Sequence, residues 1–354
     1  MQLSALTDST WKQKPLAELS CFADVFYAYD FNKPKENYRL PFIYNHNRHN
    51  QFNLNLGYVK LGVQHSKYRV NLAVHTGTYS HDNYAAEPGL VKNIFEANAG
   101  ISLSRKNNWW IDAGVFGSHI GFESAVSLDN LTLTRSLLAE NSPYYLTGAK
   151  LTYTPTVKWE VAAIICNGWQ RIQPVKGNSL PSFGTQLKFT PTEKATINWS
   201  TFIGTDDPDS GRRMRYFSNL YTQLQLTKRL ELIAGFDAGI QQTHKSSKKY
   251  NYWLSPVVIA RYKFSEHWAT ALRVEYYADK AGVIIASSSP EGFDATGLSL
   301  NFDYLPVSFL ACRMEGRWLY SSNKNFERSH VPVHHNFALL FSIALRVSQP
   351  LFKK

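Results

Sequence analysis

The stretch WATALRVEYYAD, residues 268–279, alternates apolar and polar side chains. Trp268, Leu272 and Val274 fall on one side of an extended chain, and Arg273 and Glu275 fall on the other. Alternation with a period of two predicts a β-strand that has one apolar and one polar face. Because the polar face carries charged groups, we expect it to face water.

Similar runs occur along the whole chain, each close to the ~9–11 residues that a tilted transmembrane strand needs. Short, turn-like connections such as 65–67 alternate with long ones such as 119–143. This alternation is typical of membrane barrels with short periplasmic turns and long outer loops. We predict about 16 strands, which begin near residues 20, 51, 67, 92, 109, 144, 157, 181, 194, 213, 229, 251, 267, 294, 307 and 335.

The composition also favours a membrane barrel. Aromatic residues make up 14% of the 354 residues and charged residues 18%, below the ~25% that is usual in soluble domains. The sequence contains no run of ~18 apolar residues, so it predicts no transmembrane helix. Cys21, Cys166 and Cys312 lie far apart, which indicates neither a disulfide framework nor a zinc site.

A soluble β-sandwich or propeller would also contain alternating strands. However, the apolar side of these strands carries Trp and Tyr near the strand ends, as aromatic girdles do. The opposite side is polar or glycine in nearly every strand, whereas a sandwich core needs two apolar faces. We therefore predict an all-β transmembrane antiparallel barrel over residues 19–354, preceded by an N-terminal periplasmic segment at residues 1–18.

Five segments, spread from residue 23 into the 270s, give the chain a family resemblance. They are ADVFYAYDFNKP (23–34), WWIDAGVFGSHIGFES (109–124), TRSLLAENSPYYLTGAKLTY (134–153), NGWQRI (167–172) and ALRVEYYAD (271–279). With these segments the chain resembles the β-barrel porin-2 family, porin-like outer-membrane proteins of Bacteroidota. The resemblance implies an outer-membrane barrel with a pore role, and it brings no catalytic residues.

The alternation assigns charged side chains to the inner wall of the barrel. Inward bases and acids nearly balance, so the net charge of +11 lies mostly in loops and turns. The bases gather in the second half of the chain, and rings of Lys and Arg favour anions. The predicted pore-lining residues are Arg69, Lys150, Lys188, Arg215, Arg261, Lys263, Arg273, Arg313, Arg317, Arg346, Glu231, Asp237 and Glu275.

The connection 119–143 is the longest of the chain, and irregular segments of more than ~12–15 residues are usually functional or disordered. Its leucines need a surface to pack against, so we expect the segment to fold into the barrel as a constriction loop. Arg135 is predicted to bind a wall carboxylate bidentately. The acids Glu123, Asp129 and Glu140 are predicted to face the basic wall.

Two alternatives to a pore remain open. The barrel could be a structural or accessory subunit of a larger outer-membrane complex, with the aromatic-rich segment 31–50 holding a partner. A barrel-embedded lipid-modifying enzyme would need a catalytic triad, but no GxSxG motif occurs.

Five histidines lie in two loops but lack metal-site spacing: His46, His49, His330, His334 and His335. We therefore expect no catalytic residues, metal or cofactor.

The sequence thus predicts a passive diffusion channel of the bacterial outer membrane for small polar or anionic solutes. The expected surroundings are the lipid bilayer and lipopolysaccharide, with a homo-oligomer or other outer-membrane proteins as further partners. Nucleic acid is excluded as a partner, because the basic tracts lack the interleaved aromatic residues that stack on bases.

Overall fold

The computed structural model describes residues 14–287 and 289–351. Antiparallel strands form a closed barrel in which each strand pairs with the next in the sequence and β18 pairs with β1. The sixteen barrel strands are β1 (Leu16–Asp30), β2 (Phe52–Gln64), β3 (Tyr68–Thr76), β4 (Ile94–Ser102), β5 (Trp109–Gly117), β6 (Tyr145–Thr156), β7 (Trp159–Cys166), β8 (Ser182–Thr192), β9 (Ala195–Gly204), β10 (Arg215–Gln225), β11 (Leu230–Gln242), β12 (Tyr250–Lys263), β13 (Trp268–Asp279), β14 (Phe293–Val307), β15 (Leu310–Tyr320) and β18 (His335–Pro350).

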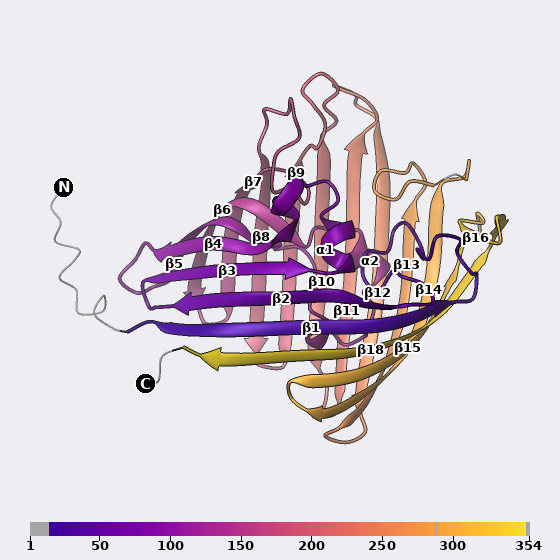
Figure 1. The fold of residues 1–354 in the computed structure, drawn as a ribbon. Helices are drawn as coiled ribbons and strands as arrows, with labels where there is room; N and C mark the ends of the chain where they lie inside the picture. Colours follow the sequence, from indigo (N-terminus) through magenta and orange to yellow (C-terminus); the bar gives the residue numbers. More distant parts are fainter. Residues whose placement is uncertain (1–13, 288, 352–354) are drawn as a thin grey trace.

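The predicted fold class and strand number are confirmed. The largest shift is at β1, which was predicted to begin near residue 20 and begins at Leu16, inside the expected segment 1–18. Residues 1–13 of that segment lie outside the described residues. In Figure 1, β1, β2 and β3 run across the view while β11, β12 and β13 run steeply, as strand tilt around a closed barrel requires.

The outer surface of the barrel is an apolar band. Leu272 and Leu300 are paired neighbours on β13 and β14, and both are exposed. Aromatic pairs mark the short-turn end: the Trp109 and Tyr153 rings stack with centroids 4.2 Å apart. Such a band with an aromatic border matches the surface that membrane barrels present to lipid.

The long connections hold the remaining secondary structure. The connection between β3 and β4 contains α1 (Thr78–Asn83) and the 3-10 helix η3 (Gly89–Asn93). Between β15 and β18, β16 (Phe326–Arg328) and β17 (Val331–Val333) form a small hairpin. Among the described residues, no helix is long and apolar enough to cross a membrane.

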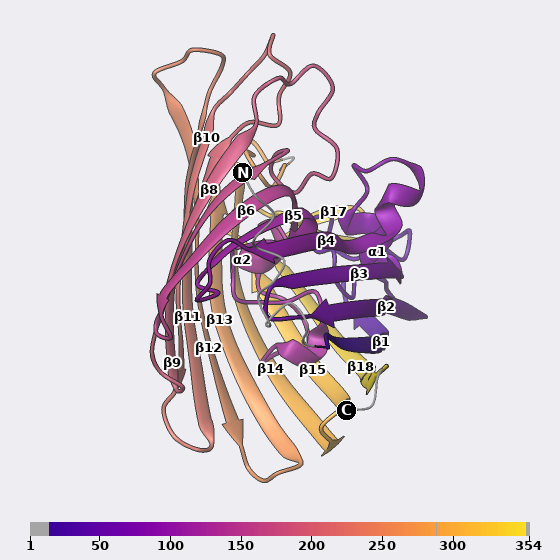
Figure 2. The same ribbon diagram turned by 90° about the vertical axis from the view of Figure 1, so that its left-hand side faces the viewer.

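The segment between β5 and β6, residues 118–144, folds into the barrel as predicted, and we call it loop 3. It contains the 3-10 helix η4 (Ser127–Asp129) and α2 (Leu137–Glu140), and Figures 1 and 2 show α2 within the ring of strands. Leu133 packs against Phe26 and Leu340 of the inner wall. Leu133, Leu137 and Leu138 are therefore buried, and Leu128 and Leu131 are partly buried.

The inner wall is adapted to this loop, and here the sequence-based description was incomplete. We expected polar or glycine residues throughout the inner face, but Ile233, Val257 and Ile259 form an apolar patch beneath Leu138. Wall glycines allow close approach: a Cβ on Gly184 would lie 2.6 Å from Nε2 of His119 in loop 3. The wall therefore matches the shape and polarity of the loop that it holds.

Substitution of adjacent residues on β8 tests which face of the strand meets lipid. Leu187 is exposed on the outer face near the middle of β8, and Lys188 faces the lumen. Leu187→Arg should destabilise the barrel by ~2–4 kcal/mol, because Arg is costly at the bilayer midplane, whereas Lys188→Gln should have little effect. Urea unfolding in lipid vesicles measures the stability of both variants. Equal losses of unfolding free energy would contradict the assignment of Leu187 to the lipid face and Lys188 to the lumen.

Candidate functional site: loop 3 and the cavities on its two sides

Loop 3 is stabilised from within by Arg135, which is fully buried. The guanidinium donates to the carbonyl oxygens of Ser124 at 2.7 Å and Leu133 at 2.9 Å, and also to that of Ala125. The predicted bidentate contact to a wall carboxylate is therefore wrong. Arg135 instead joins two separate stretches of the loop, because several carbonyl groups of irregular backbone need a donor at this depth.

Two arginines of the wall anchor loop 3, which is the role that we had assigned to Arg135. Arg313 of β15 donates to the carbonyl oxygens of Ser127 at 2.7 Å and Asn130 at 3.0 Å. Arg273 of β13 donates to the carbonyl oxygen of Thr134 at 2.7 Å. The wall arginines thus hold the loop mainly through backbone oxygens, which every loop residue has, and Arg273 also donates to the hydroxyl groups of Thr132 and Thr134.

Wall carboxylates complete the anchor. Glu315 accepts from the amide of Thr134 at 2.7 Å and from its hydroxyl at 2.6 Å, and it pairs with Arg273 at 2.9 Å. Glu275 accepts from the amide of Leu137 at 2.5 Å. Charges and loop backbone form one continuous hydrogen-bonded network, which is how buried charges are normally tolerated.

This network changes the expected role of three wall arginines, which we had predicted to line the pore. Arg273, Arg313 and Arg317 are 0%, 4% and 1% exposed, so they lie on the inner wall as predicted but beneath loop 3. Arg317 pairs with Glu275 at 2.8 Å. Arg273 and Arg313 therefore hold the loop in place, Arg317 pairs with a wall carboxylate, and all three are buried beneath the loop.

The three acids of the loop have three separate partners. Glu123 accepts from the amide of Ser136 at 3.0 Å, within the loop itself. Of the three acids, Asp129 contacts a base of the wall as predicted, since it pairs with Arg346 at 2.8 Å. Glu140 turns away from the wall and toward the segment between β1 and β2.

That segment, residues 31–51, is the second inward loop, and we call it loop 1. Glu140 accepts from the amide of Tyr44 at 2.8 Å, and the His46 ring lies 2.9 Å from the Asp24 carboxylate of β1, with both side chains fully buried. Segment 31–50 was the candidate surface for a partner only under the accessory-subunit alternative, and residues 42–49 of it are mostly buried. Its apolar stretch LPFIY, residues 40–44, which contains the buried Phe42 and Ile43, was the signal that it is partly buried.

The other predicted wall residues lie on the inner face, and most of them are paired. Arg215 lies with its guanidinium 5.1 Å from the Trp169 ring, and Asp237 accepts from Asn219 at 2.5 Å. Among the described residues, Lys150 and Lys188 have no carboxylate within ion-pair distance. The ion pairs are Arg69–Asp112, Lys263–Glu231 and Arg261–Asp303.

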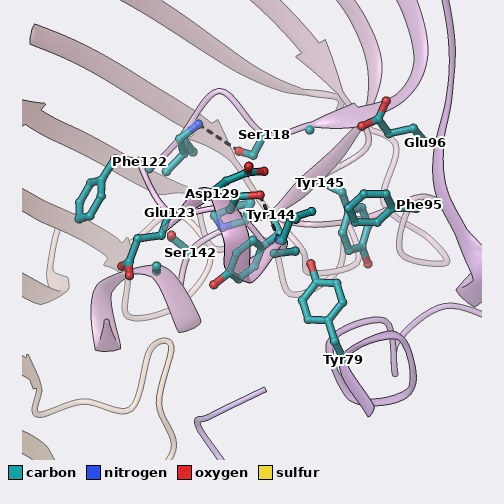
Figure 3. Close-up of a pocket in the computed structure, with 18 of the residues that line it drawn as sticks. Tyr79, Phe95, Glu96, Ser118, Phe122, Glu123, Asp129, Ser142, Tyr144 and Tyr145 are labelled. Atoms are coloured by element: carbon teal, nitrogen blue, oxygen red, sulfur yellow. Dashed lines mark hydrogen bonds between the residues drawn. The ribbon is translucent and has the colours of Figure 1, made fainter. Parts of the chain in front are cut away.

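The inner cavity lies between loop 3 and the short-turn end of the barrel and has a volume of about 430 Å³. Figure 3 shows Tyr144 near its centre, Phe122 on one side and Phe95, Tyr145 and Tyr79 on the other. Sequence reasoning missed this aromatic group, because its members come from loops and strands that are far apart in the chain. The charged lining residues are Lys60, Glu96, Glu123, Asp129 and Arg346.

The outer cavity lies on the long-loop side of loop 3 and has a volume of about 340 Å³. Its lining includes Asp82, Trp169 and Arg171 from the outer loops, together with Glu140 of α2. Ser142 lines both cavities. The two spaces therefore approach each other at Ser142, at the edge of loop 3. Among the described residues, no group of three or more His, Cys, Asp or Glu side chains could hold a metal ion.

Comparison with known families finds one match over almost the whole barrel. The family described as "Putative beta-barrel porin-2, OmpL-like" matches residues 17–347. No curated protein sequence matches the chain significantly.

Solved structures share the fold at low sequence identity. The outer membrane channel DcaP of Acinetobacter baumannii is 12% identical with a TM-score of 0.61, and the match covers 94% of this chain and 97% of that one. An anion-selective porin from Comamonas acidovorans is 8% identical with a TM-score of 0.64, over 94% and 100%. OmpF of Salmonella typhi, in complex with daunomycin, is 11% identical with a TM-score of 0.63, over 94% and 97%.

Removal of one wall arginine tests the anchor of loop 3. Arg313→Ser should free residues 127–132 and cost ~3–5 kcal/mol, because it breaks the buried pair with Asp303 and leaves loop carbonyl oxygens without a donor. Amide exchange of loop 3 in detergent should accelerate while the strands stay protected. Arg213→Ser is the control, since its half-exposed pair with Asp207 should contribute only ~0–1 kcal/mol. Unchanged exchange in Arg313→Ser would rule out the anchor.

The contact between loop 1 and loop 3 should depend on pH. Burial raises the pKa of the Glu140 carboxyl to about 7, above its usual 4.5. The folded state therefore binds this proton more readily than the unfolded state, and stability should fall as pH rises from about 5 to about 8. Glu140→Gln should flatten this part of the stability profile, measured by urea unfolding at a series of pH values. An identical profile in the variant would contradict the assignment.

Proposed function

This chain belongs to the family of β-barrel porin-2, OmpL-like proteins, and we propose that it is a passive diffusion channel for small polar solutes. Family and fold place it in the bacterial outer membrane. The observation that carries the proposal is the pair of cavities that share Ser142, one on each side of loop 3. A solute that crosses the barrel would pass from the outer cavity to the inner cavity beside this residue.

Loop 3 sets the width of this route. It fills the lumen beside β13, β14 and β15, where wall arginines bind it, and leaves the space near β2, β4 and β10 that forms the inner cavity. Irregular backbone at membrane depth is tolerated where it is buried in protein or lines water, and loop 3 does both. Glu123, Asp129, Arg135 and Glu140 hold the constriction in shape.

The charges of the lumen favour polar solutes without a strong preference for anions. The basic sector of the wall is covered by loop 3, and several remaining bases are neutralised by acids, as in the Lys60–Glu96 pair at 2.8 Å. The unpaired Lys150 and Lys188 favour anions, while Glu160 on β7 opposes Lys188 in the strand register. We therefore propose weak anion preference at most.

Two further proposals concern partners and chemistry. The apolar outer surface would meet lipid or a second copy of the chain, and OmpT of Vibrio cholerae, which shares the fold, is described as a trimer form. A homo-oligomer is therefore part of the proposal. We propose no catalytic role, since the relatives found are porins and channels. An accessory role within a larger complex would be favoured by a folded barrel that conducts no ions.

Conductance tests the route. The purified protein should conduct in planar bilayers, and Ser142→Trp should lower single-channel conductance markedly because the indole blocks the junction of the cavities. Ser142→Ala is the control and should conduct like the wild type. Silence from well-folded wild-type protein would overturn the channel, and equal conductance of Ser142→Trp would place the route elsewhere.

A further inference from the structure

The inner cavity has an unusual lining for a water-filled space. Eight aromatic rings from β2, β4, β6, β10, loop 3 and the connection between β3 and β4 surround it, and they pack against one another. The Tyr84 and Tyr145 rings stack with centroids 4.0 Å apart, and those of Tyr58 and Phe95 stack at 5.5 Å. The eight are Tyr58, Tyr79, Tyr84, Phe95, Phe122, Tyr144, Tyr145 and Tyr221.

Part of this aromatic surface is available to a solute. Phe95, Phe122 and Tyr144 are half-buried, whereas the stacked rings behind them are almost fully buried. Figure 3 shows Phe122 and Phe95 on opposite sides of Tyr144. Rings that are held by other rings lose little conformational freedom when a solute stacks on them, so the surface is preorganised for binding.

Four of the five charged side chains beside these rings form two matched pairs, and the fifth, Glu123, accepts hydrogen bonds from Ser136 within loop 3. Lys60 and Glu96 lie 2.8 Å apart on neighbouring parts of the wall, and Asp129 and Arg346 also lie 2.8 Å apart. Each pair presents hydrogen-bond donors and an acceptor side by side, with no net charge. A solute that binds without breaking a pair must therefore both donate and accept hydrogen bonds, and it gains nothing from a charge of its own.

We propose that the inner cavity is a binding site for neutral sugars of one or two rings. A sugar ring has a face of C–H groups that stacks on aromatic side chains and a rim of hydroxyl groups that both donate and accept. A purely aromatic solute would stack but leave the ion pairs desolvated, which is costly. The volume of about 430 Å³ lies within the ~300–1,000 Å³ of small-molecule sites. The proposal rests on the channel proposed above, since it names the solute of that route.

Calorimetry on the detergent-solubilised barrel tests binding without any need for conductance. Maltose and glucose should bind in the millimolar range. Sorbitol, which has the hydroxyl groups but no ring, and gluconate, which is anionic, should bind at least about tenfold more weakly, a difference that calorimetry resolves. Absence of maltose binding in folded protein that conducts would overturn the sugar site and leave the channel intact. Maltose binding by folded protein that does not conduct would overturn the channel and leave the sugar site intact.

Variants locate the site. Phe95→Ala and Tyr144→Ala should each weaken maltose binding by about tenfold, because each removes a stacking surface. Tyr153→Ala is the matched control, since Tyr153 stacks on Trp109 at the girdle and lies outside the cavity lining. Glu96→Gln is a second, more conservative variant that leaves Lys60 unpaired, and it should gain gluconate binding. Undiminished maltose affinity in both aromatic variants, with folding verified by heat-modifiable gel mobility, would overturn the proposal.

Discussion

The structure depends on the hydrogen bonds that wall arginines donate to the backbone of loop 3. Irregular backbone inside a barrel carries carbonyl oxygens and amides that no neighbouring strand can satisfy. Arg313 and Arg273 supply the donors from the wall, and Arg135 supplies them from within the loop. The acids Glu315 and Glu275 then satisfy both the arginines and loop amides. The wall arginines and acids beneath loop 3, which the sequence predicted to select among solutes, therefore have a mainly structural role.

This constraint explains why the lumen is asymmetric. Loop 3 is bound on the side of β13 to β15, and loop 1 is bound to it through Glu140 and to β1 through His46. The free space is displaced toward β2, β4 and β10, where the inner cavity lies. The wall charges that remain beside this space are paired, so the solute meets hydrogen-bonding groups and aromatic rings rather than a strong field.

The fold could be predicted almost completely from the sequence, because alternation reports directly on the two faces of each strand. Facing assignments such as Leu272 outward and Arg273 inward needed no tertiary information. The leucines of loop 3 likewise indicated that it must pack inside. The partners of Arg135 could not be predicted, since a guanidinium binds carboxylates and backbone carbonyl oxygens alike, and every residue offers a carbonyl. The contact of Glu140 with Tyr44 joins residues 96 apart, and no local pattern records it.

The same reasoning shows why the aromatic cavity is more informative about function than the charged wall. Charged groups inside a barrel have a structural use, because they hold inward loops, and the buried state of Arg313 follows from that use. Half-buried rings such as Phe95 and Tyr144 instead keep apolar surface open to a water-filled space, which costs free energy unless a solute covers it. A cavity that combines such rings with intact ion pairs is therefore suited to a solute with one apolar face and several hydroxyl groups.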